Sequence, residues 1–238
     1  MSAFFYGVAL QWKLDIRSKT LLITCYVVPL LFFAVMGGIF TAITPETRHT
    51  LIQSMSVMGI TMGTLIGLPP SLVEIYAGDI KKVYKANGVP MYLGWISMFL
   101  SAFIHLLIMS VILYFAAPIL FDATPPAHTA AYFSALALFI AVSLSIGSVL
   151  GLAIKNQAKL TMFSQLIFLP SIMLSGIMFP MDLLPKPFEL AGKLIPASWG
   201  YRLMCDDRLV FAHLWPLLAI ALVASVLCGL LLKRLQAE

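Results

Sequence analysis

The sequence has few charged residues. Only 11% of its 238 residues are Asp, Glu, Lys or Arg, whereas 61% are hydrophobic. Soluble domains carry about 25% charged and 45–50% apolar residues. A single water-facing globule cannot hide this many apolar side chains, because a domain of this size leaves much of its surface exposed. The composition therefore predicts an integral membrane protein whose outer surface is covered by lipid.

Motifs for nucleotide binding and hydrolysis are also missing from the sequence. It contains no G-x-x-x-x-G-K-[ST], no H-E-x-x-H and no G-x-S-x-G. Its three cysteines, Cys25, Cys205 and Cys228, form no C-x-x-C pair. Two of them lie in apolar runs, where a cysteine usually serves packing. We expect no catalytic residue, no metal site and no nucleotide-binding site in this chain, and hence no enzyme activity of its own.

Charge is absent from six long runs, which are 20–43, 50–73, 91–121, 130–154, 160–181 and 214–232. A helix needs about 20 apolar residues to cross the roughly 30 Å of hydrocarbon in a bilayer. The strands of membrane barrels are shorter, at about 10 residues, and alternate in polarity. The runs therefore predict an all-α integral membrane protein, a single domain over residues 1–238 with six transmembrane helices.

The lack of charge within these runs limits the mechanisms open to the protein. Ion-driven transporters usually need an ionisable group at membrane depth. His105 is the only histidine inside a run. A lone histidine there is more often hydrogen-bonded to a neighbouring helix than catalytic. The spans thus offer no internal energy source and no reaction centre.

The first 19 residues differ from a cleavable signal peptide, because charged residues interrupt them and the apolar run that follows is too long. Aromatic and apolar residues recur there at helical spacing, namely Phe4, Phe5, Val8 and Trp12. This pattern favours a helix over residues 1–19 that lies along the membrane surface. A frayed polar tail is the alternative, and it fits poorly with so many aromatic residues.

The distribution of basic residues predicts the orientation. Ten of the 15 lysines and arginines fall in the N-terminal segment, the loop 74–90, the loop 155–159 and the C-terminus. Basic residues in short loops near helix ends mark the cytoplasmic side. We therefore expect a multi-pass protein of the cell inner membrane with both termini in the cytoplasm. We attribute the net charge of +5 to these basic cytoplasmic segments. Nucleic acid is therefore not an expected partner.

The cytoplasmic loop 74–90 carries a short amphipathic pattern. Ile80, Val83 and Tyr84 fall on one helical face. Asn87-Gly88 followed by Pro90 ends that helix where the next span begins. Such a helix can rest on the lipid headgroups, or a cytoplasmic protein can grip it.

The segment 169–196 combines helix breakers with a charged pattern. Five residues are expected to bend or end helices there, namely Pro170, Gly176, Pro180, Pro185 and Pro196. Beyond the first breaks, two acid-to-base pairs are spaced four residues apart, Asp182 with Lys186 and Glu189 with Lys193. The pattern predicts a partly re-entrant segment followed by an amphipathic helix over 182–200 on the outer face. Proline-containing outer loops are common, but this series of breaks is not.

Small residues form two stripes that predict close helix contacts. The stripes lie in the second and fourth runs and consist of Gly59, Gly63, Gly67, Ser143, Gly147 and Gly151. They serve either packing within one subunit or the seam of a dimer.

Two of these segments resemble a known family. Glu74…Gly78-Asp79-Ile80…Asn87-Gly88-Val89-Pro90 resembles the loop after the second span in permeases of the type-2 ATP-binding-cassette (ABC) exporter family. The run Phe168-Leu169-Pro170…Leu174-Ser175-Gly176-Ile177-Met178-Phe179-Pro180…Leu184-Pro185…Ile195-Pro196 is similar to that family's fifth span and outer re-entrant helices. The resemblance covers nearly the whole chain, including the surface helix before the first span.

The resemblance implies that two permeases, as a homodimer or with a related chain, pair with two cytoplasmic ATPase subunits. Those subunits bind ATP and Mg, and a coupling helix passes their motion to the spans, which move a substrate outward. In this chain the ATPase contact would consist of Glu74, Tyr76, Gly78, Asp79, Ile80, Lys81, Lys82, Val83, Tyr84 and Lys85. Tyr76, Ile80, Val83 and Tyr84 would pack against the ATPase, and the charged residues would complement its charge. The N-terminal helix would shape the lateral access route.

An apolar pathway between two such permeases is compatible with a hydrophobic or amphipathic substrate, such as a drug-like molecule, a lipid or a lipid-linked glycan. The alternative is a scaffold or regulatory subunit that recruits a soluble partner through the same loop without transporting anything. An intramembrane enzyme would need a polar cluster that the runs lack.

Overall fold

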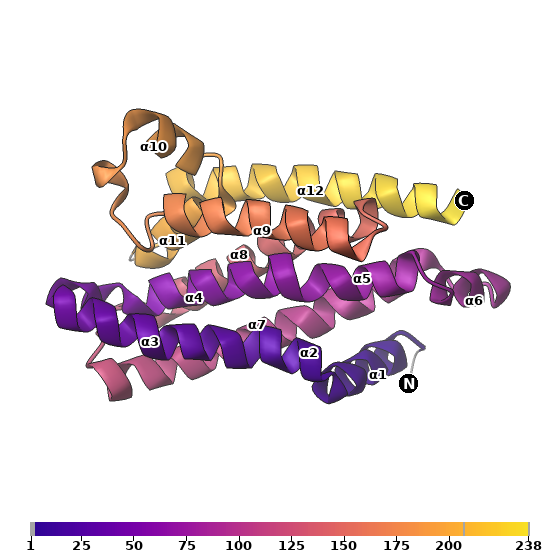
Figure 1. The fold of residues 1–238 in the computed structure, drawn as a ribbon, viewed down its shortest axis with the longest axis horizontal. Helices are drawn as coiled ribbons and strands as arrows, with labels where there is room; N and C mark the ends of the chain where they lie inside the picture. The colour runs from indigo at the N-terminus through magenta and orange to yellow at the C-terminus, as the bar shows by residue number, and fades with distance from the viewer. Residues whose placement is uncertain (1–2, 207, 238) are drawn as a thin grey trace.

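The computed structural model describes residues 3–206 and 208–237, which form helices and connecting turns with no strand among them. The long helices lie side by side along one axis (Figure 1). Within the described residues, helices long and apolar enough to cross a membrane are Ile23–Ile43, Leu51–Tyr76, Met91–Phe121, Thr129–Ala153 and Phe211–Ala237. They confirm the all-α class and five of the six expected spans: the first four and the last.

The fifth expected run, 160–181, corresponds to α9 (Gln157–Leu174). This helix has 18 residues, which gives it a length of roughly 27 Å. Gln157, Lys159 and Gln165 reduce its apolar character, so α9 does not join the five helices above. A count of six spans is therefore not confirmed by length and composition.

The first and second spans each contain a turn of π-helix. In the first, η1 (Ile23–Val27) follows α2 (Lys19–Leu22) and precedes α3 (Val28–Ile43). In the second, η3 (Gly63–Gly67) lies between α4 (Leu51–Met62) and α5 (Leu68–Tyr76). A proline, Pro29 or Pro69, follows each π-turn by two residues. Proline lacks an N–H and its ring crowds the carbonyl four residues earlier. A wider turn relieves that crowding, so each span continues past its proline.

The second span lies at the centre of the bundle. Of its most apolar window, 83% of the residues are buried, against 22% for both the first and the last span. Around it pack α7 (Met91–Phe121) and α8 (Thr129–Ala153), whereas α3 and α12 (Phe211–Ala237) lie on opposite sides of it in Figure 1. The helices α3 and α12 expose most of their apolar side chains to the surroundings.

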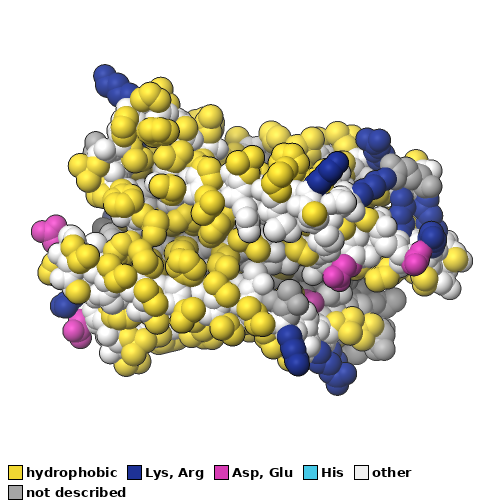
Figure 2. Space-filling view, in the orientation of Figure 1, with side chains coloured by type: hydrophobic (Ala, Val, Ile, Leu, Met, Phe, Trp, Pro, Cys, Tyr) yellow, Lys and Arg dark blue, Asp and Glu magenta, His cyan; other side chains and the backbone are white. Residues whose placement is uncertain are grey.

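The chain ends and α6 (Ile80–Ala86) lie at one end of the bundle, and the turns between α3 and α4 lie at the other (Figure 1). Figure 2 shows hydrophobic side chains over the middle of the visible face and most of its Lys and Arg side chains toward the end that carries α6. Charged ends around an apolar belt are what a bilayer requires, because charge at the centre of the hydrocarbon is costly.

The segment after α9 differs from the simplest form of the expected pattern in two ways. Pro170 does not break the helix, because α9 continues through it to Leu174. The break falls at Gly176, whose φ of +88° is a left-handed conformation that glycine adopts without steric cost. Instead of one amphipathic helix over 182–200, three short helices follow, namely η4 (Met181–Leu183), α10 (Lys186–Gly192) and α11 (Pro196–Cys205).

Prolines separate these short helices. Pro180 and Pro185 precede η4 and α10, and Pro196 begins α11. Proline is suited to a helix start, where its missing N–H would be unpaired in any case. The expected pair of Glu189 and Lys193 is confirmed, with 2.7 Å between carboxylate and ammonium. The expected pair of Asp182 and Lys186 involves the Asp182 side chain, which lies outside the described residues.

Candidate functional site

The connection between α5 and α7 exposes a small apolar surface on α6. The side chains of Ile80 and Val83 are 44% and 57% exposed. Asp79 and Lys82 form an ion pair of 2.8 Å beside them. The hydrogen bond from Lys82 lowers the pKa of Asp79, and the same bond raises the pKa of Lys82. Apolar side chains flanked by solvated charge, on a short helix at one end of the bundle, form a surface suited to a protein partner.

Two tyrosines expected at that surface turn toward the bundle instead. Tyr76 is only 3% exposed, and its hydroxyl donates a hydrogen bond of 2.6 Å to the carbonyl of Met91. A Cβ built on Gly94 would approach both the Tyr76 hydroxyl and the ring of Tyr84. Tyr76 therefore fastens the loop to α7, and its burial within the chain removes it from the expected partner surface. Tyr84 is half-buried against the same helix.

The remaining expected contact residues surround α6. Gly78 lies in the turn before the helix, where a Cβ would collide with the carbonyl oxygen of Glu74. Glycine is thus required for the tight change of direction between α5 and α6. Lys81 is half-buried, and the exposed residues of the expected set are Glu74, Gly78, Asp79, Ile80, Lys82, Val83 and Lys85.

The glycine stripes pack within the chain. A Cβ on Gly59 would meet Met109, one on Gly63 would meet Leu106, and one on Gly67 would meet Cys25. The second span thus approaches α7 and the first π-turn through these glycines. In α8, a Cβ on Gly147 would collide with the carbonyl of Thr64, and one on Gly151 would meet Leu72 and Pro69. Of the two alternatives for the stripes, these contacts support packing within one subunit.

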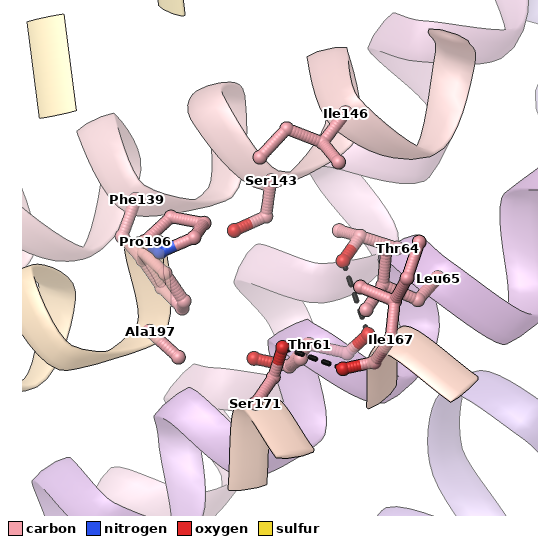
Figure 3. A pocket seen from close by; sticks show the side chains of 10 residues that line it. All are labelled: Thr61, Thr64, Leu65, Phe139, Ser143, Ile146, Ile167, Ser171, Pro196 and Ala197. Atoms are coloured by element: carbon pink, nitrogen blue, oxygen red, sulfur yellow. Dashed lines mark hydrogen bonds between the residues drawn. The ribbon is translucent and has the colours of Figure 1, made fainter. Parts of the chain in front are cut away.

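A pocket of about 50 Å³ lies in the centre of the bundle, where α4, η3, α8, α9 and α11 meet (Figure 3). The hydroxyls of Thr61 and Ser171 donate to backbone carbonyls at 2.7 Å. Ser143 also lines the pocket and is 5% exposed. The sequence did not predict this pocket, because its hydroxyls come from separate helices.

A larger cavity of about 440 Å³ opens near the end of the bundle opposite α6. Its walls come from α3, η2 (Pro45–His49), α4 and the segment after α9. Most of the lining is apolar, including Phe40, Leu51 and Phe179. Hydroxyls are contributed by Thr44, Thr47, Thr50 and Ser54. Such a cavity can accept an apolar molecule that carries a few hydrogen-bonding groups.

The N-terminal helix α1 (Ala3–Arg17) buries an acid against α7. Asp15 is 7% exposed. It accepts hydrogen bonds from the Gln11 side-chain amide at 2.8 Å and from the Ser101 hydroxyl at 2.5 Å. Burial raises the pKa of Asp15, while the two hydrogen bonds and nearby His105 oppose that rise. The membrane bundle therefore does hold an acid, which the apolar runs did not reveal because Asp15 lies outside them in the sequence.

His105 joins three parts of the molecule. Its Nδ1 is 2.7 Å from the hydroxyl of Tyr26 in the first span. On α1, the Trp12 ring stacks on the imidazole with 4.2 Å between centroids and 12° between planes. The expected hydrogen bond to a neighbouring helix is thus confirmed. Of the aromatic residues that predicted a surface helix at the N-terminus, Trp12 packs into the bundle, and the side chains of Phe4 and Phe5 lie outside the described residues.

These features define a multi-pass membrane protein with an exposed helix between two spans and an apolar cavity near its other end. Comparison with protein families matches residues 2–206 to the family described as ABC-2 type transporter. The match covers most of the chain, so the chain belongs to this family. It is a membrane permease domain of an ABC transporter, a class that pairs with an ABC ATPase. Comparison with curated protein sequences found no match.

Proposed function

We propose that the chain is the permease subunit of an ATP-driven exporter. Two copies, or this chain and a related permease, form the substrate pathway, and two cytoplasmic ATPase subunits bind ATP and Mg. Ile80 and Val83 carry this proposal, because they are exposed on a short helix between two spans. A P-loop is missing from the sequence, so the nucleotide must act through a partner.

The arrangement of the chain ends supports a sixth crossing by α9. The N-terminus, the C-terminus and α6 lie at the same end of the bundle (Figure 1). A chain with both termini on one side crosses the membrane an even number of times, and the five candidate spans need one more. Basic residues gather at this end (Figure 2). This supports the proposal that the protein lies in the inner membrane with this end facing the cytoplasm.

The outer cavity supports a hydrophobic or amphipathic substrate. Its volume of about 440 Å³ lies within the 300–1,000 Å³ that is typical of small-molecule sites. Apolar walls suit an acyl chain or a drug-like ring system, and the threonine and serine hydroxyls suit its polar groups. A lipid, a lipid-linked glycan and a drug-like molecule all meet this description.

Co-purification tests the ATPase contact. The tagged chain should bring down a separate ATPase subunit and should hydrolyse no ATP by itself. The double change Ile80→Asp and Val83→Asp places two carboxylates on the exposed surface and should abolish the association. Leu194→Asp is a matched control, because Leu194 is 81% exposed at the outer end. Unchanged association of the double variant would refute the assignment of α6.

A non-transporting scaffold could use the same surface of α6, so transport must be measured directly. Vesicles that hold the permease and the ATPase should accumulate a labelled lipid or drug-like substrate only with ATP. Association without any ATP-dependent movement of candidate substrates would favour the scaffold. Movement by the permease alone would contradict the need for an ATPase.

A further inference from the structure

We propose that Asp15 and His105 together form a proton-binding site, and that proton occupancy sets how firmly α1 docks on the membrane bundle. The site lies where α1, the first span and α7 meet. It is separate from the α6 surface, so the inference stands whether or not that surface binds an ATPase.

The first argument is the unbalanced charge of Asp15. Both of its carboxylate oxygens accept hydrogen bonds, and both donors, Gln11 and Ser101, are neutral. No lysine or arginine forms an ion pair with Asp15 in the described part of the chain. Lys13 and Arg17 on the same helix are exposed. A buried carboxylate without a cation is costly, and a nearby group that can take up a proton removes that cost.

The groups around Asp15 leave His105 as the cation source. The first span contributes the Cys25 thiol and the Tyr26 phenol, both neutral near pH 7 in their ordinary states. The second span contributes Gly63, Gly67, Leu68 and Ser71, none of which titrates. From α7 comes His105, one helical turn after Ser101, and its charge interacts with that of Asp15. Among the described groups around Asp15, only the imidazole can supply a positive charge.

The second argument is the state of the imidazole. Nδ1 is paired with the Tyr26 hydroxyl, whereas Nε2 is buried without a hydrogen-bond partner in the described residues. When Nδ1–H donates to Tyr26, the lone pair of Nε2 is free to form an N–H bond with a proton taken from the cytoplasmic solvent. The resulting imidazolium is balanced by the Asp15 carboxylate. The Trp12 ring stacked on it adds a cation–π attraction.

The third argument is that these contacts connect α1 to the rest of the bundle. Trp12 and Asp15 lie on one face of α1, and Ser101 and His105 lie on one face of α7. Once the imidazole is protonated, its positive charge on α7 attracts the carboxylate on α1. Without the proton, the same contact holds a net negative charge. A small cavity bordered by Asp15, Cys25, Gly63 and Gly67 places this charge against both π-turns, and such turns are common at functional sites.

Fluorescence of Trp12 tests the site directly, because an imidazolium stacked on an indole quenches its emission. The full-length chain in lipid nanodiscs carries Trp95→Phe, Trp199→Phe and Trp215→Phe, which leaves Trp12 as the one remaining tryptophan of four. Emission should fall in a single step as the pH decreases through the range of about pH 5 to 8, in which histidine titrates. Adding His105→Gln should remove the step.

The role of Asp15 has its own variant. Asp15→Asn removes the opposing charge and should move the midpoint of the titration down by about one pH unit or more. Asp122→Asn is the matched control, because Asp122 is exposed at the far end of α7 and should leave the midpoint unchanged. A step that persists in His105→Gln, or a midpoint that Asp15→Asn does not move, would overturn the proposal.

Amide hydrogen exchange tests the docking without the Asp15 variant. After correction for intrinsic rates, exchange in residues 3–17 should become faster as the pH rises through the same midpoint. In His105→Gln it should be fast and lose that dependence. Exchange that is independent of pH in the unmodified chain would contradict the coupling of the proton to α1.

Discussion

The end of the bundle that carries the chain termini uses aspartate in two opposite ways. On α6, Asp79 lies in solvent beside Lys82, and this partner lowers its pKa. On α1, Asp15 is buried among neutral donors, and burial raises its pKa. An exposed ion pair contributes little stability, because water and salt screen it. A buried carboxylate constrains everything around it, since each of its lost hydrogen bonds must be replaced. The comparison therefore distinguishes the solvent-exposed surface of α6 around Asp79, which can bind a partner, from the buried contact of Asp15, which holds α1 against the rest of the chain.

Ser101→Ala should have the largest effect on this comparison. It leaves a buried carboxylate oxygen without its donor, which costs about 1–3 kcal/mol. Amide exchange in α1 should accelerate roughly tenfold or more, since each 1.4 kcal/mol is tenfold, while exchange in α6 should not change. Ser134→Ala is the control, because Ser134 is exposed on α8 and bonds only its own helix. Equal exchange in both variants would mean that the Asp15 contact does not hold α1.

Acidification should act on the two helices in opposite directions. The pKa of Asp15 is raised in the folded protein, so its contribution favours docking below its ordinary value of about 3.9 and is lost as the pH rises through the folded value. The pKa of Asp79 is lowered in the folded protein. The contribution of its ion pair is therefore present above the ordinary aspartate pKa of about 3.9, and it is lost as the pH falls through the lowered pKa. Exchange measured peptide by peptide should show α1 slowing on acidification and α6 accelerating by a much smaller margin, because the Asp79–Lys82 pair is exposed. Changes of the same sign would break the comparison.

Tyr76→Phe should have a smaller effect that is confined to the loop. Removing the hydroxyl that bonds the Met91 carbonyl costs about 0.5–1.5 kcal/mol. Exchange should increase at the start of α7, and binding of an ATPase should persist because the Tyr76 ring is buried within the chain. Tyr92→Phe is the control, since Tyr92 is 54% exposed. Loss of ATPase binding with unchanged amide exchange would mean that Tyr76 contacts the ATPase after all.

Lys82→Ala should have the smallest effect on stability. The pair of Lys82 with Asp79 is fully exposed, so the thermal unfolding midpoint should not change. The pKa of Asp79 should return toward its ordinary value, which a carboxyl-labelled NMR titration would detect. Lys85→Ala, in the same exposed helix, should leave both quantities unchanged. A lower unfolding midpoint for Lys82→Ala alone would show that the pair supports the fold.

Much of the fold was predictable from runs of residues. Five uncharged runs became membrane-length helices, since lipid tolerates few charges along a span. Glycine spacing predicted close helix contacts, and Gly147 against the Thr64 carbonyl is one of them. The effect of Pro170 was not predictable in this way. A proline in a helix costs a hydrogen bond, and surrounding contacts decide whether the helix ends or continues past it.

The candidate sites also divide into features that could be predicted from the sequence and features that could not. The exposed side chains of Ile80 and Val83 follow from a local amphipathic pattern and needed no knowledge of distant residues. The burial of Tyr76 depends on the Met91 carbonyl, 15 residues away. Asp15 and Ser101 are separated by 86 residues. No periodicity in one segment reports on a partner so far along the chain.

The sequence by itself determined that this protein is helical, that it is embedded in lipid, and where most of its spans begin and end. These properties depend on local hydrophobicity, which each segment carries whatever its neighbours are. Tertiary structure alone decided that an acid outside the apolar runs would be buried beside the histidine of α7. The energy of a charged group depends on its three-dimensional surroundings, and folding creates those surroundings from distant parts of the chain.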